Sequence, residues 1–128
     1  MAEHGTFCWN ELMTRNAEAA KRFYGETLGW TFSEMPMPEG GVYHVAMMGE
    51  KMVGGIFDIS GTEFEGVPEN WFAYIAVDDV DARLEKLKAA GGKVEREPWD
   101  VPGVGRIAMV TDVNGAAQGW MVPSEESA

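Results

Sequence analysis

The chain has 128 residues, the usual length of one domain, and its 45% apolar content is enough for a core without disulfides or metal. Ten Lys and Arg against 21 Asp and Glu give a formal net charge of −11, which argues against nucleic acid or a membrane surface as a partner. The single cysteine, Cys8, excludes an intrachain disulfide and favours a cytoplasmic protein. Neither a signal peptide nor a membrane-spanning apolar run is expected.

The first half of the chain predicts one helix and four strands. Residues 7–13 alternate as a strand does, and Asn16 is placed to cap a helix that Gly29 ends. This helix should turn Ala20, Phe23 and Leu28 toward the core. The expected elements are a strand at 7–13, a helix at 17–28, a strand at 30–34, an irregular Pro/Gly loop at 35–41, and strands at 42–48 and 52–59.

Residues 60–70, with two glycines, a proline and three glutamates, predict a linker, and the same order of elements follows it. Asp79 is placed to cap the second helix, whose apolar stripe is Val80, Leu84, Leu87 and Ala90. The expected elements are strands at 71–77 and 93–96, a helix at 80–90, a Pro/Gly loop at 98–103, and strands at 104–110 and 117–122 around a turn at 112–115.

The residues repeat as well as the pattern. Residues 41–47 (GVYHVAM) align with residues 103–109 (GVGRIAM), which sets His44 opposite Arg106. Helix, glycine stop, loop and strand recur at nearly one offset, so chance similarity is a poor explanation. The sequence therefore predicts one domain, 1–128, built of two βαβββ modules at about 6–59 and 71–123.

Two such modules resemble the vicinal oxygen chelate superfamily of glyoxalases, bleomycin resistance proteins and extradiol dioxygenases, and most of all its single-domain, glyoxalase-like branch. The resemblance is carried by residues 16–24 running to Leu28-Gly29-Trp30, by residues 76–81 running to Gly91-Gly92, and by the turn at 112–115. It implies an α+β fold in which two modules form a curved, cup-like mixed sheet with the helices outside. In metal-dependent members the cup holds a divalent ion that chelates vicinal oxygens of the substrate.

The resemblance places the metal ligands on the first and last strand of each module, at Trp9, Gly55, Phe72 and Gly119. The family pattern has His, Gln or Glu there, whereas Trp, Phe and Gly side chains offer a divalent ion no donor. We therefore expect no metal and no other cofactor. We also expect neither a glyoxalase I nor an extradiol dioxygenase reaction, since both need the metal.

Strand positions turned toward the predicted cup, together with Trp99 of the Pro/Gly loop at 98–103, are the candidate ligand-binding residues. They are Trp9, Glu11, Gly55, Phe57, Phe72, Tyr74, Trp99, Gly119 and Met121. Large rings beside glycines favour a flat ligand, or a ring of the protein itself, packed over bare backbone. Trp99, with Met35 and Met37 in the matching loop, is either a lid over the cup or a core or dimer contact.

Three of the inward or nearby polar residues are candidates for chemistry, each with a plainer alternative. Glu11 is a polar anchor or general base, or else a carboxylate near the strand end that is either paired with Arg15 or solvated. His44 is a ligand or proton shuttle, or else a polar residue on the solvent side of its strand. Tyr74 hydrogen-bonds a ligand, or else fills space. Cys8 is expected to be a buried, inert thiol.

Three functions fit these features. The first is a metal-independent protein that binds a small apolar or aromatic molecule in the cup. The second is a lyase or other enzyme of the superfamily with a displaced metal or a metal-free acid–base site at Glu11, His44 or Tyr74. The third is a non-catalytic interaction module. A monomer with paired modules and a homodimer that shares them are both compatible with the sequence.

Overall fold

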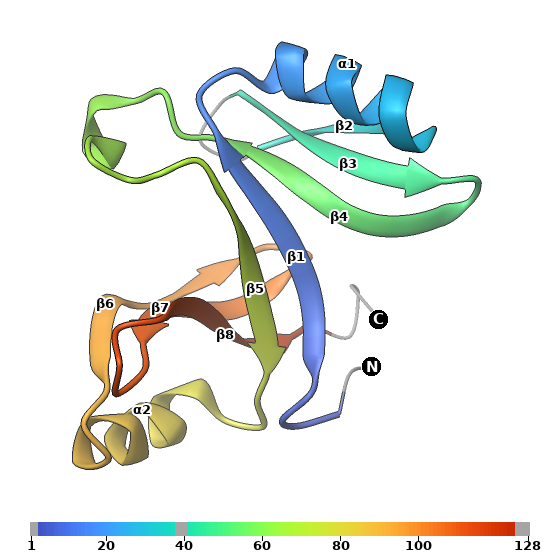
Figure 1. Cartoon of the computed structure of the whole chain (residues 1–128). Helices are drawn as coiled ribbons and strands as arrows, with labels where there is room; N and C mark the ends of the chain where they lie inside the picture. The colour runs from blue at the N-terminus through green and yellow to red at the C-terminus, as the bar shows by residue number, and fades with distance from the viewer. Residues whose placement is uncertain (1–2, 38–40, 125–128) are drawn as a thin grey trace. The chain divides into compact units, whose positions relative to one another are not determined.

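The computed structural model describes residues 3–37 and 41–124 and contains the predicted βαβββ order twice (Figure 1). The elements of the first half are β1 (Phe7–Thr14), α1 (Ala17–Leu28), β2 (Thr31–Pro36), β3 (Val42–Met48) and β4 (Lys51–Asp58). A short 3₁₀ turn, η1 (Thr62–Phe64), leads to the second half. Its elements are β5 (Asn70–Ala76), α2 (Val80–Ala89), β6 (Lys93–Val101), β7 (Gly105–Thr111) and β8 (Ala117–Pro123).

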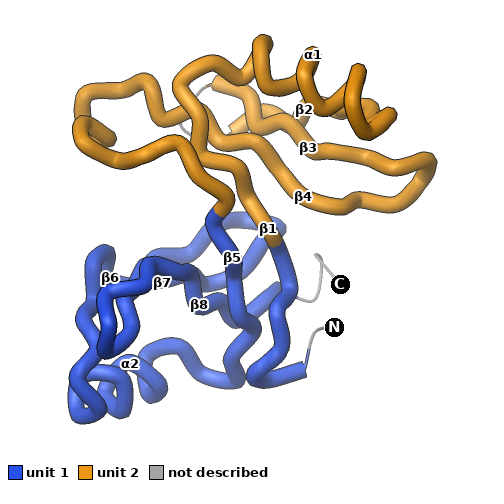
Figure 2. The backbone as a smooth tube through the Cα atoms, viewed as in Figure 1, with its two compact units in different colours: residues 1–9, 72–128 blue, residues 10–71 orange. Residues whose placement is uncertain are grey.

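The chain divides into two compact units, shown in different colours in Figure 2. Residues 10–71 form one unit, called the α1 unit below, and residues 1–9 with 72–128 form the other, called the α2 unit. β1 and β5 each run through the border between the two. None of the helices in the described part of the chain has the length and apolar character that a membrane crossing requires.

Each unit repeats one pattern of strand pairing. In the α1 unit β4 pairs with β3 in antiparallel fashion and with β1 in parallel, and in the α2 unit β8 pairs in the same way with β7 and β5. The outer strands β2 and β6 add to β3 and β7. The hydrogen-bonded order is β2-β3-β4-β1-β5-β8-β7-β6, which confirms the predicted α+β class with a mixed sheet.

The helix α2 covers one face of its strands as predicted. Asp79 caps it through a hydrogen bond from the Ala82 backbone N–H to Oδ1 at 3.1 Å. Val80, Leu84 and Leu87 are buried in one apolar cluster with Val77, Ala108 and Val110 of the same unit. The predicted stripe is confirmed except at Ala90, which is the exposed C-terminal cap.

The helix α1 has the predicted bounds but not the predicted core contacts. Asn16 caps it by accepting a hydrogen bond from the Ala19 N–H at 3.0 Å, and Gly29 ends it with φ of +78°. None of its twelve residues, all of them described, is buried, and Phe23 and Leu28 are 58% and 51% exposed. The prediction that Phe23 and Leu28 face the core is wrong, whereas Ala20 is half-buried. The inward ring contact of this helix is made by Tyr24, which stacks on Trp30 at 5.3 Å.

Both Pro/Gly loops are shorter than predicted. Met35 and Pro36 belong to β2, and Pro98 and Trp99 belong to β6. Both strands lie at the ends of the hydrogen-bonded order, where a proline without an N–H costs no interstrand bond on the open side. In β6 the register also shifts between Arg96 and Trp99. Residues 38–40 of the predicted first loop lie outside the described part.

Candidate functional site

One candidate site lies on the face of the α1-unit strands opposite α1. Glu11 of β1 is in register with Gly55 of β4, which is in register with Val45 of β3. Tyr43, two residues before Val45, shares this face, and its hydroxyl donates a hydrogen bond to Glu11 Oε1 at 2.8 Å. We call the set Glu11, Tyr43, Val45, Gly55 and Phe57 the Glu11 face.

Gly55 leaves the space that the Tyr43 ring fills. A Cβ built on Gly55 would lie 2.6 Å from Cε2 of Tyr43 and closer still to its Cζ and hydroxyl oxygen. No side chain fits there unless the ring moves. The glycine therefore lets the phenol lie over the backbone of β4 and reach the carboxylate.

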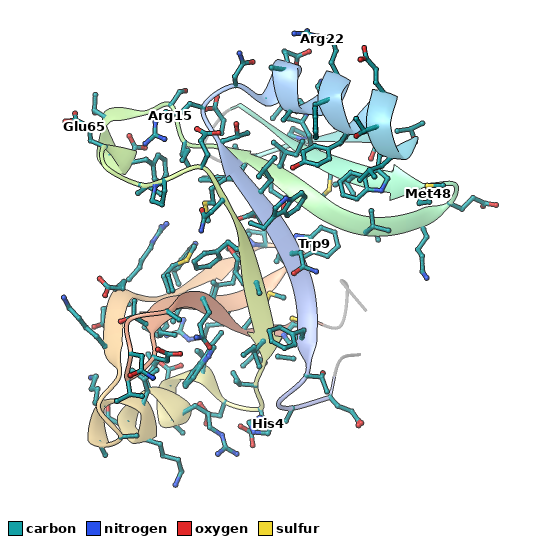
Figure 3. The ribbon with its side chains drawn as sticks, viewed as in Figure 1. His4, Trp9, Arg15, Arg22, Met48 and Glu65 are labelled. Carbon is teal, nitrogen blue, oxygen red and sulfur yellow. The ribbon has the colours of Figure 1, made fainter. Side chains whose placement is uncertain are left out.

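Glu11 is a buried carboxylate, with 8% of its surface exposed. The predicted alternative, a pair with Arg15, is wrong, because the Arg15 guanidinium bonds Glu69 at 3.4 Å and the Phe64 carbonyl at 2.9 Å. Figure 3 labels Arg15 after β1, near Glu65 in the segment that contains Phe64. Burial of a carboxylate is costly without hydrogen bonds, which the Tyr43 hydroxyl helps to supply.

The α2 unit has a matching face opposite α2. Tyr74 of β5 is in register with Gly119 of β8, and a Cβ on Gly119 would overlap the Tyr74 ring. Phe72 meets that ring edge to face, with 5.4 Å between centroids. Phe72, Tyr74 and Met121 are all buried. Thus the rings that cover the two glycines belong to Tyr43 and Tyr74, not to Trp9 and Phe72 as the sequence suggested.

The other predicted binding residues lie on strands at partly exposed positions. Trp9 is half-buried on β1 (Figure 3). Phe57 is half-buried and meets Phe64 edge to face at 5.5 Å. Trp99 lies in β6 opposite Ile107, with the Arg96 guanidinium 3.6 Å from its ring centroid. Trp99 and Met35 are strand residues, so they do not form the lid of two loops that the sequence offered as one alternative.

His44 lies on the other face of the α1-unit strands, away from Glu11. It is in register with Glu34 and Ile56, on the side where it interacts electrostatically with Glu18 of α1. The prediction of a solvent-facing position is wrong, because only 9% of the side chain is exposed. Its repeat counterpart Arg106 also reaches its own helix, bonding Asp81 at 2.8 Å. Nδ1 of His44 has no hydrogen-bond partner among the described residues.

The residues that the structure describes do not fit a bound divalent metal. Among the described residues there is no group of three or more His, Cys, Asp or Glu side chains arranged to hold one. On the Glu11 face the tyrosine ring occupies the space over Gly55, and Glu11 is the one ionisable donor of the set besides that phenol. A protein site for zinc or a related ion needs three or four such donors.

The titratable groups with the largest shifts are surface pairs around α2. The Arg83 guanidinium, hydrogen-bonded to Asp78 at 2.9 and 3.0 Å, lowers the pKa of that carboxyl to about 2. Arg106 bonds Asp81 and Asp100 and lowers the pKa of Asp81. Partial burial raises the pKa of the Cys8 thiol, which is half-buried rather than buried as predicted. The arginine–aspartate pairs are surface ion pairs and are separate from the Glu11 face.

A cleft that the sequence did not predict lies beside α1, within the α1 unit. Its volume is about 460 Å³. The apolar part of its wall consists of Leu12, Ala19, Ala20, Phe23, Tyr24 and Trp71. No predicted binding residue lines it. The sequence shows large rings at Phe23 and Tyr24 within the predicted helix and at Trp71 at the start of a predicted strand, but their meeting in space depends on the fold.

Comparison with known proteins assigns residues 6–117 to the family described as "Glyoxalase/Bleomycin resistance protein/Dioxygenase superfamily". A relative named "Putative glyoxylase CFP32" from Mycobacterium tuberculosis is 41% identical over 124 residues, which cover 97% of this chain and 46% of that protein. The "Anthracycline biosynthesis protein DnrV" of Streptomyces peucetius is 32% identical over 124 residues, covering 88% of this chain and 45% of that protein. The chain thus spans about half the length of these curated relatives.

Solved structures share the fold at low sequence identity. A hypothetical protein, BH1468, from Bacillus halodurans C-125 has a TM-score of 0.72 at 14% identity, over 96% of this chain and 97% of that one. Methylmalonyl-CoA epimerase from Mycobacterium tuberculosis has a TM-score of 0.66 at 14% identity, over 99% and 95% of the two chains. At this identity the likeness shows the fold alone.

Proposed function

Because this chain belongs to the glyoxalase/bleomycin resistance protein/dioxygenase superfamily, we propose that it binds a planar or apolar small molecule without the metal of that family. One observation carries the proposal. Glu11 is a buried carboxylate held by the Tyr43 hydroxyl on a sheet face that is otherwise apolar or bare glycine. A small-molecule site commonly consists of an apolar surface with one or two polar groups that orient the ligand.

In this proposal Glu11 orients the ligand. A carboxylate accepts hydrogen bonds at both oxygens, about four in all, so it is able to hold Tyr43 and a ligand O–H or N–H at the same time. A bond to a charged acceptor is stronger than one between neutral groups, and more so away from water. The preferred ligand therefore carries a hydroxyl, phenol or amine donor at the edge of a flat or apolar body.

Aromatic side chains supply the remaining contacts. Trp9 precedes Glu11 by two residues on β1, and Phe57 follows Gly55 by two on β4, so each shares strand parity with a residue of the Glu11 face. A ring stacked on an indole contributes about 0.5–1.5 kcal/mol beyond the area that it buries. About 100 Å² of buried apolar ligand surface adds roughly 2.5 kcal/mol. After ordering losses we expect micromolar affinity.

The names of two relatives support a polycyclic aromatic ligand. They are called anthracycline biosynthesis proteins and are 32% identical to this chain. An anthracycline has a flat fused-ring body with hydroxyl groups at its edge, which is the shape that the Glu11 face favours. We therefore propose hydroxylated polycyclic aromatics as the first compounds to test.

A second function, catalysis, is favoured by the same pair. The Tyr43 hydroxyl oxygen and Glu11 Oε1 are 2.8 Å apart, a distance that allows proton transfer between a phenol and a carboxylate. Relatives named as putative glyoxylases support a carbonyl substrate. His44 is on the opposite face and is no part of this arrangement. An enzyme converts such a compound, whereas a binding protein returns it unchanged.

The test is a panel of hydroxylated polycyclic and carbonyl compounds, followed by thermal shift, tryptophan fluorescence and product analysis. We expect a compound with an edge hydroxyl to raise Tm and to quench the tryptophan fluorescence. Trp9→Phe should remove most of the quenching. Glu11→Gln should weaken binding about tenfold, which corresponds to the loss of one hydrogen bond to a charged group. Glu18→Gln, at an exposed helix position, is the matched control. Equal affinity of Glu11→Gln and wild type would exclude the proposed anchor.

A further inference from the structure

Three aromatic rings, those of Phe23, Tyr24 and Trp71, line the cleft beside α1. Tyr24 lies between Phe23 and Trp71, with ring centroids at 5.0 Å and 5.7 Å and interplanar angles of 87° and 74°. The three rings therefore present their faces and edges in different directions. Phe23 remains 58% exposed and Trp71 40% exposed, so both keep surface available to a molecule in the cleft.

These rings are held in place before any ligand arrives. The Trp71 indole Nε1 donates a hydrogen bond to the Tyr24 hydroxyl at 3.2 Å. The Tyr24 ring also stacks on Trp30, with 5.3 Å between centroids and 24° between planes. Trp30 in turn meets Trp71 edge to face at 6.0 Å. A preordered ring cluster loses little side-chain entropy on binding.

The lining of the cleft also contains polar residues and one charge. Thr14, Asn16, Glu69 and Asn70 line it, and Glu69 is the one charged residue among the ten that line the cleft. The backbone N–H of Arg15 donates to Glu69 Oε2 at 2.9 Å. The Arg15 guanidinium also bonds that oxygen, but Arg15 itself does not line the cleft. Hydrogen bonds from Thr14 and Arg15 lower the pKa of Glu69, so it is ionised at neutral pH.

We propose that this cleft is a second binding site, separate from the Glu11 face, and that it takes a small organic cation such as a quaternary or alkylated amine. Aromatic faces attract a cation through the ring quadrupole, and alkyl groups on nitrogen pack against the rings. The Glu69 carboxylate and the net charge of −11 add attraction at longer range. The volume of about 460 Å³ lies within the usual range for small-molecule sites.

A matched pair of probes separates charge from shape. Choline and 3,3-dimethylbutan-1-ol have nearly the same shape, but only choline carries the positive charge. We expect saturation-transfer NMR of the methyl protons to show choline bound to the full chain. The neutral alcohol should bind at least fivefold more weakly. The difference should shrink at high salt.

Variants then assign the binding to this cleft. Trp71→Leu and Tyr24→Leu should each weaken choline binding about twofold to fivefold, which corresponds to about 0.5–1 kcal/mol for one exposed cation–π contact. Trp71→Phe should retain more affinity than Trp71→Leu, because it keeps an aromatic face. Phe7→Leu is the matched control, since Phe7 is a 71% exposed ring of the α2 unit. Circular dichroism of each variant checks that it is folded.

Three results would overturn the proposal. Equal binding of choline and its neutral isostere means that the cleft recognises shape alone. Loss of choline binding in Glu11→Gln rather than in Trp71→Leu places the cation at the Glu11 face. Absence of choline binding, with self-association in sedimentation that Trp71→Leu abolishes, shows that a second copy of this chain covers the rings.

Discussion

The substitution Gly55→Ala tests whether the Glu11 face is a packed arrangement. The added methyl would lie 2.6 Å from Tyr43 Cε2 and nearer to Cζ and the hydroxyl oxygen. Because atoms that are not bonded to each other do not approach so closely, the Tyr43 ring must move. Its hydroxyl then leaves Glu11 Oε1, where the two oxygens are now 2.8 Å apart.

The expected loss combines two costs and one gain. Forcing an extra methyl into a packed site costs about 1–3 kcal/mol. Losing a hydrogen bond to a buried carboxylate costs about 1–3 kcal/mol if the ring leaves entirely. The two overlap, because the ring relieves the clash by giving up the bond. Replacing glycine by alanine in a strand returns roughly 0.5–1 kcal/mol of backbone entropy. We expect a net destabilisation of about 1–3 kcal/mol.

Urea unfolding followed by circular dichroism measures this free energy. Gly25→Ala in α1 is the control, since its Cβ would meet only the Trp30 carbonyl at an ordinary 3.5 Å, and it should be neutral or stabilising by up to about 1 kcal/mol. In the background of Tyr43→Ala the cost of Gly55→Ala should disappear, with a coupling energy of about 0.5–3 kcal/mol. A Gly55→Ala protein as stable as wild type, or no coupling, would refute the packing argument.

Three further predictions concern the rest of the fold. Gly119→Ala should destabilise by about 1–3 kcal/mol in urea unfolding, because its Cβ would overlap the Tyr74 ring, and a neutral result would contradict that overlap. Leu84→Ala, at a 3% exposed position, should cost about 2–5 kcal/mol. Leu28→Ala, at a 51% exposed position, should cost under about 1 kcal/mol, and similar losses for both would show that α1 is as well packed as α2. Arg83→Gln should lower stability above pH 4, where the pair of Arg83 with ionised Asp78 stabilises the fold. The difference in stability between wild type and variant should vanish as the pH falls from 3.8 to about 2, and thermal unfolding in a pH series measures it.

Local signals in the sequence predicted much of the fold. Asn16 and Gly29 each act on the backbone beside them, so the bounds of α1 follow from those residues. Parity predicted that Trp9 and Glu11 share a face of the first strand, because alternation along a strand depends only on neighbouring residues. The internal repeat added Gly55, which is in register with Glu11. The internal repeat predicted that Gly55 and Gly119 hold equivalent places, and each pairs in parallel with the first strand of its half.

Features that depend on contacts between distant residues were not predictable. Tyr24 rather than Phe23 faces the strands, because Trp30 and Trp71 meet its ring there. His44 is buried rather than solvent-facing, because α1 lies over its face of the strands, and periodicity along β3 carries no information about what covers a face. The prolines in β2 and β6 read as loop signals, and only the strand order shows that both strands are at an edge.

The internal repeat also explains why a carboxylate occurs in one half alone. The register sets Glu11 against Gly55 and Tyr74 against Gly119, so Glu11 and Tyr74 are counterparts. The counterpart of Tyr43 is Gly105, by the alignment of residues 41–47 with 103–109. In the α2 unit the ring over the glycine therefore belongs to Tyr74 of β5, the first strand of that half. In the α1 unit the ring belongs to Tyr43 of β3, so the position on the first strand, β1, is occupied by the acid Glu11. The two halves therefore share the same backbone pairing but differ in the strand that supplies the ring. This difference gives the α1 unit Glu11, the polar anchor on which the proposed function depends.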